Sequence, residues 1–469
     1  MNSYLRYFCY FSALACFITC LFALSGIYVV ISIIPVFFFL FVFFANSLSN
    51  LWANRPMSLY ILTIMLWIRM VMLPFYGTVS GAYSSHSSAL ELQQFLISSV
   101  FLCIYDSFAV FFLLLVVSTK IKNSSRLLAT GGLYGQKGVY IVFCLIALLV
   151  FVTVGRHMHL FDFAIKPVGD GLERAGDIVD SRTLLIGSIV GTGVTFMFLL
   201  LLNRFHKKYN RTLSDKYFIF SIICALLIIS IISGERRTSQ LYKGFASAYL
   251  LLSLYPHKSR KTLSTIGIFA FMIIALMTVY KQFNAFMYDS YSEAMQNASI
   301  NKGLSYKVID SYFYGISTIA TNLYYGQQMN LGASQLFYDF FRNVFGINFF
   351  IHDDRLLTTQ MYNMVIYSGD QMTGLLLTSV GYGYLFGGFL LAPFATIFNV
   401  LIMLFFERCL RNSKTIEWQY VFAFVFIRFA FGVLSATPPL INLISRLLVI
   451  NGSIIIIARM IKNLMIKYE

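Results

Sequence analysis

The sequence predicts an all-α polytopic membrane protein with about twelve transmembrane helices. Of its 469 residues, 58% are hydrophobic and 17% are aromatic, whereas a soluble domain is about 45–50% apolar. Apolar runs of about 20 residues, enough to cross about 30 Å of hydrocarbon as a helix, recur along the whole chain. Lysine and arginine gather in every second loop between these runs, as the positive-inside rule describes.

The first two apolar runs predict a helical hairpin at the N-terminus. Phe8–Leu24 is followed, after Ser25 and Gly26, by Tyr28–Phe44. No small-residue cleavage site lies between polar flanks here, so we expect the chain to keep this hairpin and not to lose it as a signal peptide.

Hydropathy predicts the remaining spans, and charge orients them. If the N-terminus is cytoplasmic, basic loops such as Lys120–Lys137 and Arg204–Lys216 face the cytoplasm, and so do both termini. This division accounts for most of the net charge of +16, so nucleic acid is not an expected partner. The remaining predicted spans are Met57–Tyr76, Phe95–Val117, Val139–Val154, Leu184–Leu202, Tyr217–Ser233, Leu241–Leu254, Leu263–Tyr280, Tyr382–Phe406, Trp418–Leu434 and Ile441–Met460.

A long loop interrupts the series of short connections. Residues 1–281 carry the predicted helices 1–9, residues 282–381 form an extracytoplasmic loop, and residues 382–469 carry helices 10–12. A loop of about one hundred residues is usually functional or has its own structure.

Two segments of this loop predict helices in the outer membrane interface. In "SQLFYDFFRNVFGINFF", apolar residues recur at i, i+3, i+4 spacing with polar residues on the other side. The apolar residues are Leu336, Phe337, Phe340, Phe341, Val344 and Phe345, and the polar ones are Asp339, Arg342 and Asn343. Such a helix either caps the helical bundle or helps to hold a lipid substrate. The second segment, "KVIDSYFYGISTIATNLYY", carries tyrosines that suit the headgroup level.

Known cofactor and metal motifs do not occur in the sequence. The seven cysteines lie in or beside apolar runs, without CxxC or Cys/His spacing, so neither disulfides nor zinc are expected. GxGxxG, P-loop and HExxH motifs are also missing. We therefore predict no cofactor and no metal.

Few charges fall inside the predicted spans. Asp106 and Arg69 are expected to form an ion pair, because each alone would cost several kcal/mol in hydrocarbon. Arg428 and Arg446 are the other intramembrane cations, and Arg446 is expected near the outer end of its helix.

The predicted outer face carries a larger set of cations. Arginine presents a planar fork of donors that keeps its charge and suits bidentate capture of phosphate oxygens. Placed beside lipid, this set predicts a site for a lipid-linked phosphate or pyrophosphate. The candidate phosphate-binding residues are Arg182, Arg236, Arg237, Lys243, Arg342, Arg355 and Arg446.

Acids and a histidine in the long loop are candidates for a general base. They are Asp289, Glu293, His352 and Asp353, chosen because they lie in the loop and not because their spacing selects them. Together with the cations, they would permit transfer of a glycan from a lipid pyrophosphate to a sugar hydroxyl, since preorganised arginines stabilise the charge that develops on the leaving pyrophosphate.

Two further stretches carry a resemblance to a known family. "IISGERRTSQLYKG" contains a Gly-x-Arg turn between two predicted spans, and "GDQMTGLLLTSVGYGYLFGGFLLAP" is a glycine-rich return from the long loop. With this architecture, the chain resembles the Wzy-type polymerases of O-antigen and capsular polysaccharide. In place of the family's acidic-x-Tyr-x-Asn-Phe-Gly form, the return segment has "SVGYGYLFGG", which leaves no acid there for catalysis.

The resemblance implies a GT-C-like fold in a bacterial inner membrane. It implies undecaprenyl-pyrophosphate-linked repeat units as donor and acceptor, and a polysaccharide chain-length regulator as a further partner. Arg236, the Gly-x-Arg residue, would grip the donor pyrophosphate, with Arg237 beside it. The alternatives are an O-antigen ligase-type glycosyltransferase, which shares the fold and donor, and a flippase for the same lipid-linked units.

Overall fold

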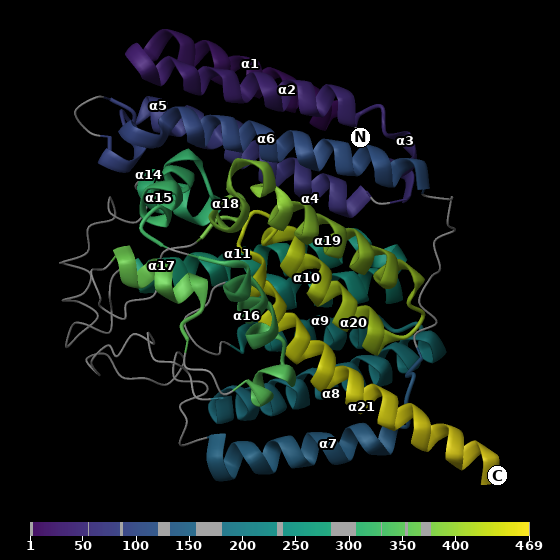
Figure 1. Ribbon diagram of the computed structural model, residues 1–469. Coiled ribbons are helices and arrows are strands. Elements are labelled where there is room, and N and C mark those ends of the chain that lie inside the picture. The colour runs from purple at the N-terminus through teal and green to yellow at the C-terminus, as the bar shows by residue number, and fades with distance from the viewer. Residues whose placement is uncertain are drawn as a thin grey trace, which may run out of the picture. The chain divides into compact units, whose positions relative to one another are not determined.

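The computed structural model is helical in nearly all of the chain that it describes (Figure 1). It describes residues 3–54, 56–84, 88–120, 132–155, 181–231, 238–282, 306–329, 331–351, 355–366 and 377–468. Within these ranges, the single strand-like feature is an antiparallel bridge between Thr378 and Ser435.

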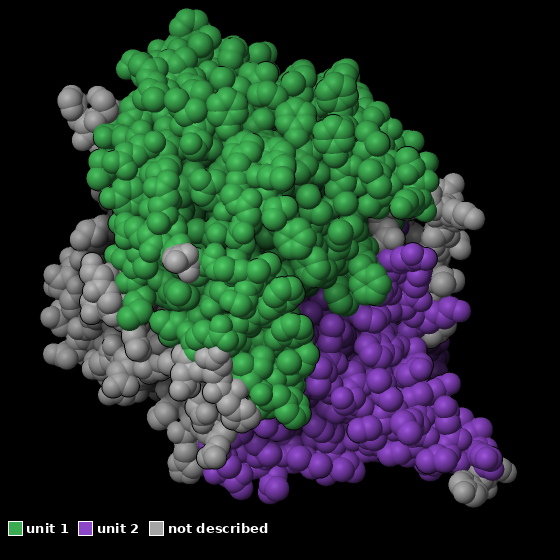
Figure 2. Space-filling model, in the orientation of Figure 1, with its two compact units in different colours: residues 1–125, 301–407, 428–442 green, residues 126–300, 408–427, 443–469 purple. Residues whose placement is uncertain are grey.

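The chain divides into two compact units (Figure 2). Unit 1 comprises residues 1–125, 301–407 and 428–442, and unit 2 comprises residues 126–300, 408–427 and 443–469. Each unit is assembled from segments that are distant in sequence, and each is described by itself below.

Seven described helices are long and apolar enough to cross a membrane, and a bent pair raises the number to as many as eight. The chain is therefore a multi-pass helical membrane protein, while the count of about twelve spans stays a prediction. The seven are Ser3–Ala23, Gly26–Ala45, Pro56–Val79, Leu90–Lys120, Lys137–Val154, Leu185–Thr212 and Thr437–Lys467.

The N-terminal hairpin takes the predicted form in unit 1. Helix α1 (Ser3–Ala23) packs against η1 (Gly26–Ser32) and α2 (Ile33–Ala45). Gly26 reverses the chain with a φ of +62°, which glycine adopts at little cost. The buried residues of α1 are small and stand at helical spacing, so the neighbouring helix backbones can approach closely; they are Cys9, Ala13, Cys16 and Cys20.

A π-helical turn interrupts the next span. Helix α4 (Pro56–Trp67) runs into η2 (Ile68–Met72) and then α5 (Leu73–Val79). Pro74, at the start of α5, has no backbone N–H to donate to the preceding turn, which favours a local departure from α-helical hydrogen bonding there. Helix α6 (Leu90–Lys120) follows as a long span.

The second predicted interfacial helix is in fact two helices that pack on the spans of unit 1. Helices α14 (Tyr306–Phe313) and α15 (Ile316–Gly326) are separated by a turn at Tyr314, whose φ is +58°. Helix α14 contacts α5 and η2, and α15 contacts α6. The apolar side chains of α15 are buried in these contacts, and the interfacial position expected for this segment stays a prediction; the buried side chains are Ile316, Ile319, Ala320 and Leu323.

The expected span Tyr382–Phe406 is also broken. Helices α18 (Ser379–Leu391) and α19 (Phe394–Asn412) meet at an angle of 113°. The backbone leaves helical geometry at Gly387 and Gly388, the latter with a φ of +60°, and Pro393 then prevents continuous hydrogen bonding. Phe389 stacks on Tyr105, so the bend lies against the middle of α6.

In the part of the chain that the structure describes, unit 1 contains three further helices. They are α3 (Ser49–Asn54), α16 (Ala333–Asn343) with the following turn η7 (Ile347–Phe350), and α17 (Thr358–Ile366).

Unit 2 is built from the middle of the chain and parts of the C-terminal helices. Buried Glu417 organises one end of it, accepting hydrogen bonds from the Tyr134 backbone N–H at 2.7 Å and the Tyr140 hydroxyl at 3.0 Å. Its helices are α7 (Lys137–Val150), η3 (Phe151–Gly155), α8 (Ser181–Thr212), α9 (Asp215–Ser230), α10 (Thr238–Leu254), η5 (Pro256–Lys258), α11 (Ser259–Gln282), and the relevant parts of α19, α20 (Ile416–Phe431) and α21 (Thr437–Tyr468).

Candidate functional site

Most of the predicted site residues lie outside the described residues. These are Arg236, Arg237, Asp289, Glu293, His352 and Asp353. Arg182 lies in the first turn of α8, but its side chain is not described. Of the remaining four, Arg342 and Arg355 belong to unit 1, and Lys243 and Arg446 to unit 2.

Lys243 holds a turn in unit 2. Its ammonium donates a hydrogen bond to the Ile231 carbonyl at 2.6 Å, and the Gln240 amide donates to the same oxygen at 3.2 Å. This carbonyl directly follows α9, where unpaired carbonyls need donors. Lys243 therefore stabilises the end of α9, and the phosphate-binding role predicted for it stays a prediction.

The polar face of helix α16 packs against other helices of unit 1. Asp339, only 1% exposed, accepts hydrogen bonds from the Gln335 amide at 3.1 Å, the Thr358 backbone N–H at 3.0 Å and the Tyr382 hydroxyl at 2.9 Å. Burial raises the pKa of Asp339, and these donors partly offset that rise. One carboxyl group thus joins α16 to α17 and α18.

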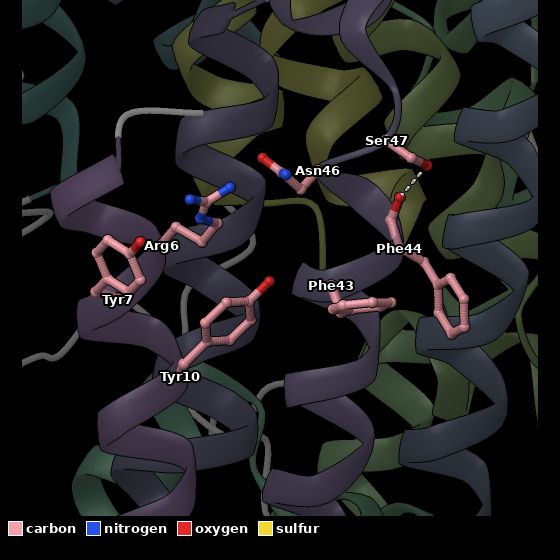
Figure 3. A pocket seen from close by; sticks show the side chains of 7 residues that line it. All are labelled: Arg6, Tyr7, Tyr10, Phe43, Phe44, Asn46 and Ser47. Carbon is pink, nitrogen blue, oxygen red and sulfur yellow. Dashed lines mark hydrogen bonds between the residues drawn. The ribbon is translucent and has the colours of Figure 1, made fainter.

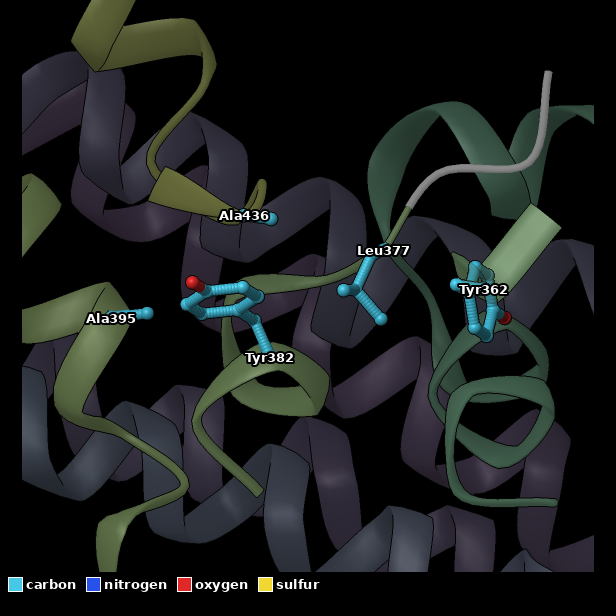
Figure 4. Packing of buried hydrophobic residues seen from close by; sticks show 5 residues of the cluster. All are labelled: Tyr362, Leu377, Tyr382, Ala395 and Ala436. Carbon is cyan, nitrogen blue, oxygen red and sulfur yellow. The ribbon is translucent and has the colours of Figure 1, made fainter. Parts of the chain in front are cut away.

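A small hydrophobic core lies beside this carboxyl group (Figure 4). Tyr382 contributes its ring to the core and its hydroxyl to Asp339. Leu336 and Phe340 of α16 pack against the same cluster. The buried members of the cluster are Tyr362, Leu377, Tyr382, Ala395 and Ala436.

The aromatic face of α16 is left exposed. Phe337 is 62% exposed and Phe341 is 49% exposed, and Phe350 in the next turn is 83% exposed. An exposed apolar face of this kind needs apolar surroundings, and the position of α16 at a membrane interface stays a prediction. We call Phe337, Phe341, Ile347, Phe349 and Phe350 the α16 aromatic face.

Two of the predicted phosphate-binding arginines flank this face. Arg342 donates to the Asn348 carbonyl at 2.8 Å. The exposed guanidinium of Arg355 lies over the Tyr338 ring, 5.0 Å from its centre, and the Tyr338 hydroxyl donates to the Arg355 carbonyl at 2.6 Å. The structure therefore brings two of the candidate cations together at α16, with Arg342 on the helix and Arg355 against Tyr338, four residues before Arg342.

The expected ion pair between Arg69 and Asp106 is present. Nη1 of Arg69 lies 2.7 Å from Oδ2 of Asp106, and the two side chains are 0% and 1% exposed. Arg69 stands in the π-helical turn η2, and Asp106 lies on α6. Nε and Nη2 of Arg69 and Oδ1 of Asp106 make no hydrogen bond to any residue that the structure describes.

A second buried acid, Asp310, adjoins this pair and was not predicted as a site residue. It accepts hydrogen bonds from the Tyr306 hydroxyl at 2.7 Å and from the backbone N–H and hydroxyl of Thr318 at 2.8 and 2.7 Å. Its helix α14 contacts the turn η2 that carries Arg69. The only sequence signal was an acid inside an apolar segment, "KVIDSYF". We call Arg69, Asp106 and Asp310 the buried ionic cluster.

A separate pocket of about 420 Å³ lies near the start of α1 and the end of α2 (Figure 3). Arg6 provides its cation and lies over the ring of Tyr7 at 5.2 Å. Polar groups here adjoin aromatic rings, as is common where helices meet lipid headgroups. The lining residues are Arg6, Tyr7, Tyr10, Phe43, Phe44, Asn46 and Ser47.

No known protein family, curated protein or solved structure matches this chain. Among the residues that the structure describes, no group of three or more His, Cys, Asp or Glu side chains could hold a metal ion. What is established is thus a polytopic helical membrane protein with a carboxyl-anchored aromatic helix and a buried ionic cluster.

Proposed function

We propose that this protein is a glycosyltransferase that joins undecaprenyl-pyrophosphate-linked oligosaccharide repeat units into O-antigen or capsular polysaccharide. It would act at the outer face of a bacterial cytoplasmic membrane, with about twelve helices in a GT-C-like arrangement and both termini in the cytoplasm. A chain-length regulator would be a further partner.

The observation that carries this proposal is the α16 aromatic face with its two arginines. Exposed phenylalanines suit the polyprenyl chain or the surrounding lipid. The guanidinium groups of the two arginines suit the oxygens of a pyrophosphate. A lipid-linked pyrophosphate combines these two chemistries, and Arg342 and Arg355 would be two of the groups that receive it.

In the proposed reaction, the acceptor hydroxyl oxygen forms a bond to the anomeric carbon of the donor glycan. The bond from that carbon to the pyrophosphate oxygen breaks, and undecaprenyl pyrophosphate leaves with the electron pair. The hydroxyl proton passes to a base, for which Asp289, Glu293, His352 and Asp353 are the candidates. Arg236 and Arg237 are assigned to the leaving pyrophosphate by the family resemblance.

Deletion of the gene, followed by electrophoresis of the surface glycan, tests the proposal. We expect the glycan ladder to collapse to a single repeat unit. Restoring the chain with Arg236→Ala should give normal protein levels and single-unit glycan without long polymer. Persistence of long polymer in the deletion strain would refute the function, and persistence in the Arg236→Ala strain would refute that residue's assignment.

A flippase for the same lipid-linked units is the second candidate. The charges of Arg69 and Asp106 inside the spans and the broken pair α18–α19 favour it, because transporters commonly place ionisable groups and discontinuous helices near the membrane midplane. Units trapped on the cytoplasmic side of the deletion strain would identify a flippase. Lipid-linked polymer accumulating without surface glycan would identify the ligase-type alternative.

A further inference from the structure

We propose that the buried ionic cluster is a proton-binding site, in which one exchangeable proton resides on Asp106 or Asp310 at neutral pH. This bound proton keeps the helical hairpin α14–α15 seated against η2 and α5. The proposal is independent of the glycan substrate and of the choice between polymerase and flippase.

The first argument is the balance of charge. The cluster contains one guanidinium and two carboxyl groups, and all three side chains are at most 1% exposed. Arginine does not lose its proton in proteins. With both carboxyls ionised, the cluster would bury one uncompensated negative charge, which is strongly unfavourable. A proton on either carboxyl group removes this excess.

The second argument is that the three groups form one site. Arg69 is hydrogen-bonded to Asp106, and helix α14, which carries Asp310, contacts the turn η2, which carries Arg69. The tip of the hairpin fits tightly here, because a Cβ atom at Gly315 would overlap Oδ1 of Asp310 and would lie 2.7 Å from Leu73. Leu73 directly follows η2, so the turn of the hairpin rests beside the π-helical turn that carries Arg69.

The third argument is the unused hydrogen-bonding capacity inside the cluster. Nε and Nη2 of Arg69 and Oδ1 of Asp106 are buried and make no well-aligned hydrogen bond to a described residue, and the Thr396 hydroxyl is a further polar group beside Asp106. Buried polar groups normally find a partner in protein or ordered water. These atoms offer two donors and one acceptor, which suits water molecules that exchange a proton with a carboxyl group.

The other titratable groups around the cluster are thiols and phenols. Cys103, Cys16 and Cys20 come from the neighbouring spans, Tyr83 from the segment between α5 and α6, and Tyr306 from the first turn of α14. Their ordinary pKa values are alkaline, and burial raises the pKa of Tyr83 and Tyr306 further. The carboxyl groups are therefore the ones that can release a proton as the pH rises from acid to neutral.

The direction of the pH effect follows from Asp310. Burial raises its pKa, and the hydrogen bonds from Thr318 and Tyr306 partly oppose the rise. A carboxyl group with a raised pKa in the folded state binds its proton more tightly there than in the unfolded state. Its stabilising contribution is complete below the ordinary carboxyl pKa and is lost as the pH rises through the raised value.

Two measurements on the purified full chain in detergent test the proposal. We expect the infrared spectrum at neutral pH to contain a carboxylic-acid C=O band that Asp106→Asn or Asp310→Asn removes. The exposed Asp215 provides the matched control, and Asp215→Asn should retain the band. Thermal unfolding should show a Tm that falls with rising pH in the wild type and in Asp215→Asn, and falls less in Asp310→Asn.

An acid band of undiminished intensity in both Asn variants, or equal pH dependence in all the variants, would overturn the proposal. If the single Asn variants do not fold, the charge-balanced pair Arg69→Met with Asp106→Asn replaces them. Asp310 is then the only carboxyl group of the cluster, and its acid band should be present. An ionised Asp310 in that double variant would equally overturn the proposal.

Discussion

Asp339 accepts a hydrogen bond from the backbone N–H of Thr358 at 3.0 Å, so a buried carboxyl group on α16 satisfies the first turn of α17. The N-terminal N–H groups of a helix have no partner within the helix and attract negative charge. The same carboxyl group also receives the Tyr382 hydroxyl of α18. The position of the α16 aromatic face therefore depends on one acid that points away from it.

Replacing Asp339 by Ala should lower the stability of the protein and loosen the packing of α16 against α17 and α18. The change leaves the Thr358 N–H and the Tyr382 hydroxyl without their partner, at about 1–3 kcal/mol for each buried group. Tyr382→Phe is the matched comparison, since it removes one donor and keeps the ring, and should cost about 1 kcal/mol. Denaturant unfolding in detergent measures both, and equal stability of Asp339→Ala and the wild type would contradict the role.

The ion pair between Arg69 and Asp106 should show strong coupling in a double-mutant cycle. Arg69→Met leaves a buried carboxyl group uncompensated and should cost about 3–5 kcal/mol of stability. Adding Asp106→Asn should recover a large part of that loss, because the remaining groups are neutral. Additive effects of the two substitutions in thermal unfolding would show that the two side chains do not act as a pair.

Gly315→Ala should weaken the packing of the hairpin α14–α15 against α5 and η2. The added Cβ atom would overlap Asp310, and overpacking of this kind costs about 1–3 kcal/mol. Gly332→Ala is the control, because no atom lies within 4 Å of its added Cβ. Limited proteolysis should cleave the Gly315→Ala protein faster near residues 306–326, and unchanged cleavage would show that the tight fit is relieved without moving the hairpin.

The α16 aromatic face should contact lipid. Tryptophan introduced as Phe341→Trp should be quenched by brominated lipids in reconstituted vesicles, after subtraction of the signal of the three native tryptophans. Lys307→Trp, at an exposed position on α14, is the control and should be quenched less. Equal quenching at the two positions would mean that the aromatic face has no special access to lipid.

Arg342→Lys and Arg355→Lys should weaken polymerisation if these residues contact pyrophosphate through two nitrogens. Lysine keeps the charge but lacks the planar fork. We expect shorter glycan chains at normal protein levels in the Lys variants and a greater loss in the Ala variants. Wild-type glycan chain lengths in the Lys variants would mean that only the positive charge of these residues matters. Wild-type lengths in the Ala variants would mean that the two residues do not bind the pyrophosphate.

Local patterns in the sequence predicted part of this structure. The hairpin of α1 and α2 followed from two apolar runs with a glycine between them, and the pair of Arg69 with Asp106 followed from the cost of isolated charges in hydrocarbon. The bend between α18 and α19 had its signals in Gly387, Gly388 and Pro393, but hydropathy averages over such breaks.

The candidate site was less accessible from sequence, because its partners come from distant segments. Helical periodicity placed Leu336 and Phe340 on one apolar face with Phe337 and Phe341, whereas in the structure the first two pack on the protein and the last two are exposed. This difference depends on Thr358 and Tyr382, which reach Asp339 from other helices. Asp310 was missed for the same reason, since its neighbour Arg69 lies more than two hundred positions earlier in the chain.

The bridge between Thr378 and Ser435 limits where unit 1 can flex. The Ser379 N–H donates to the Leu434 carbonyl at 2.8 Å, and the Ala436 N–H donates to the Leu377 carbonyl at 3.0 Å. These two amides should exchange with deuterium more slowly than amides in other loops, because breaking one of the two hydrogen bonds requires breaking the other. The two segments then move together, and slow rearrangement in this region would concentrate at Gly387 and Gly388.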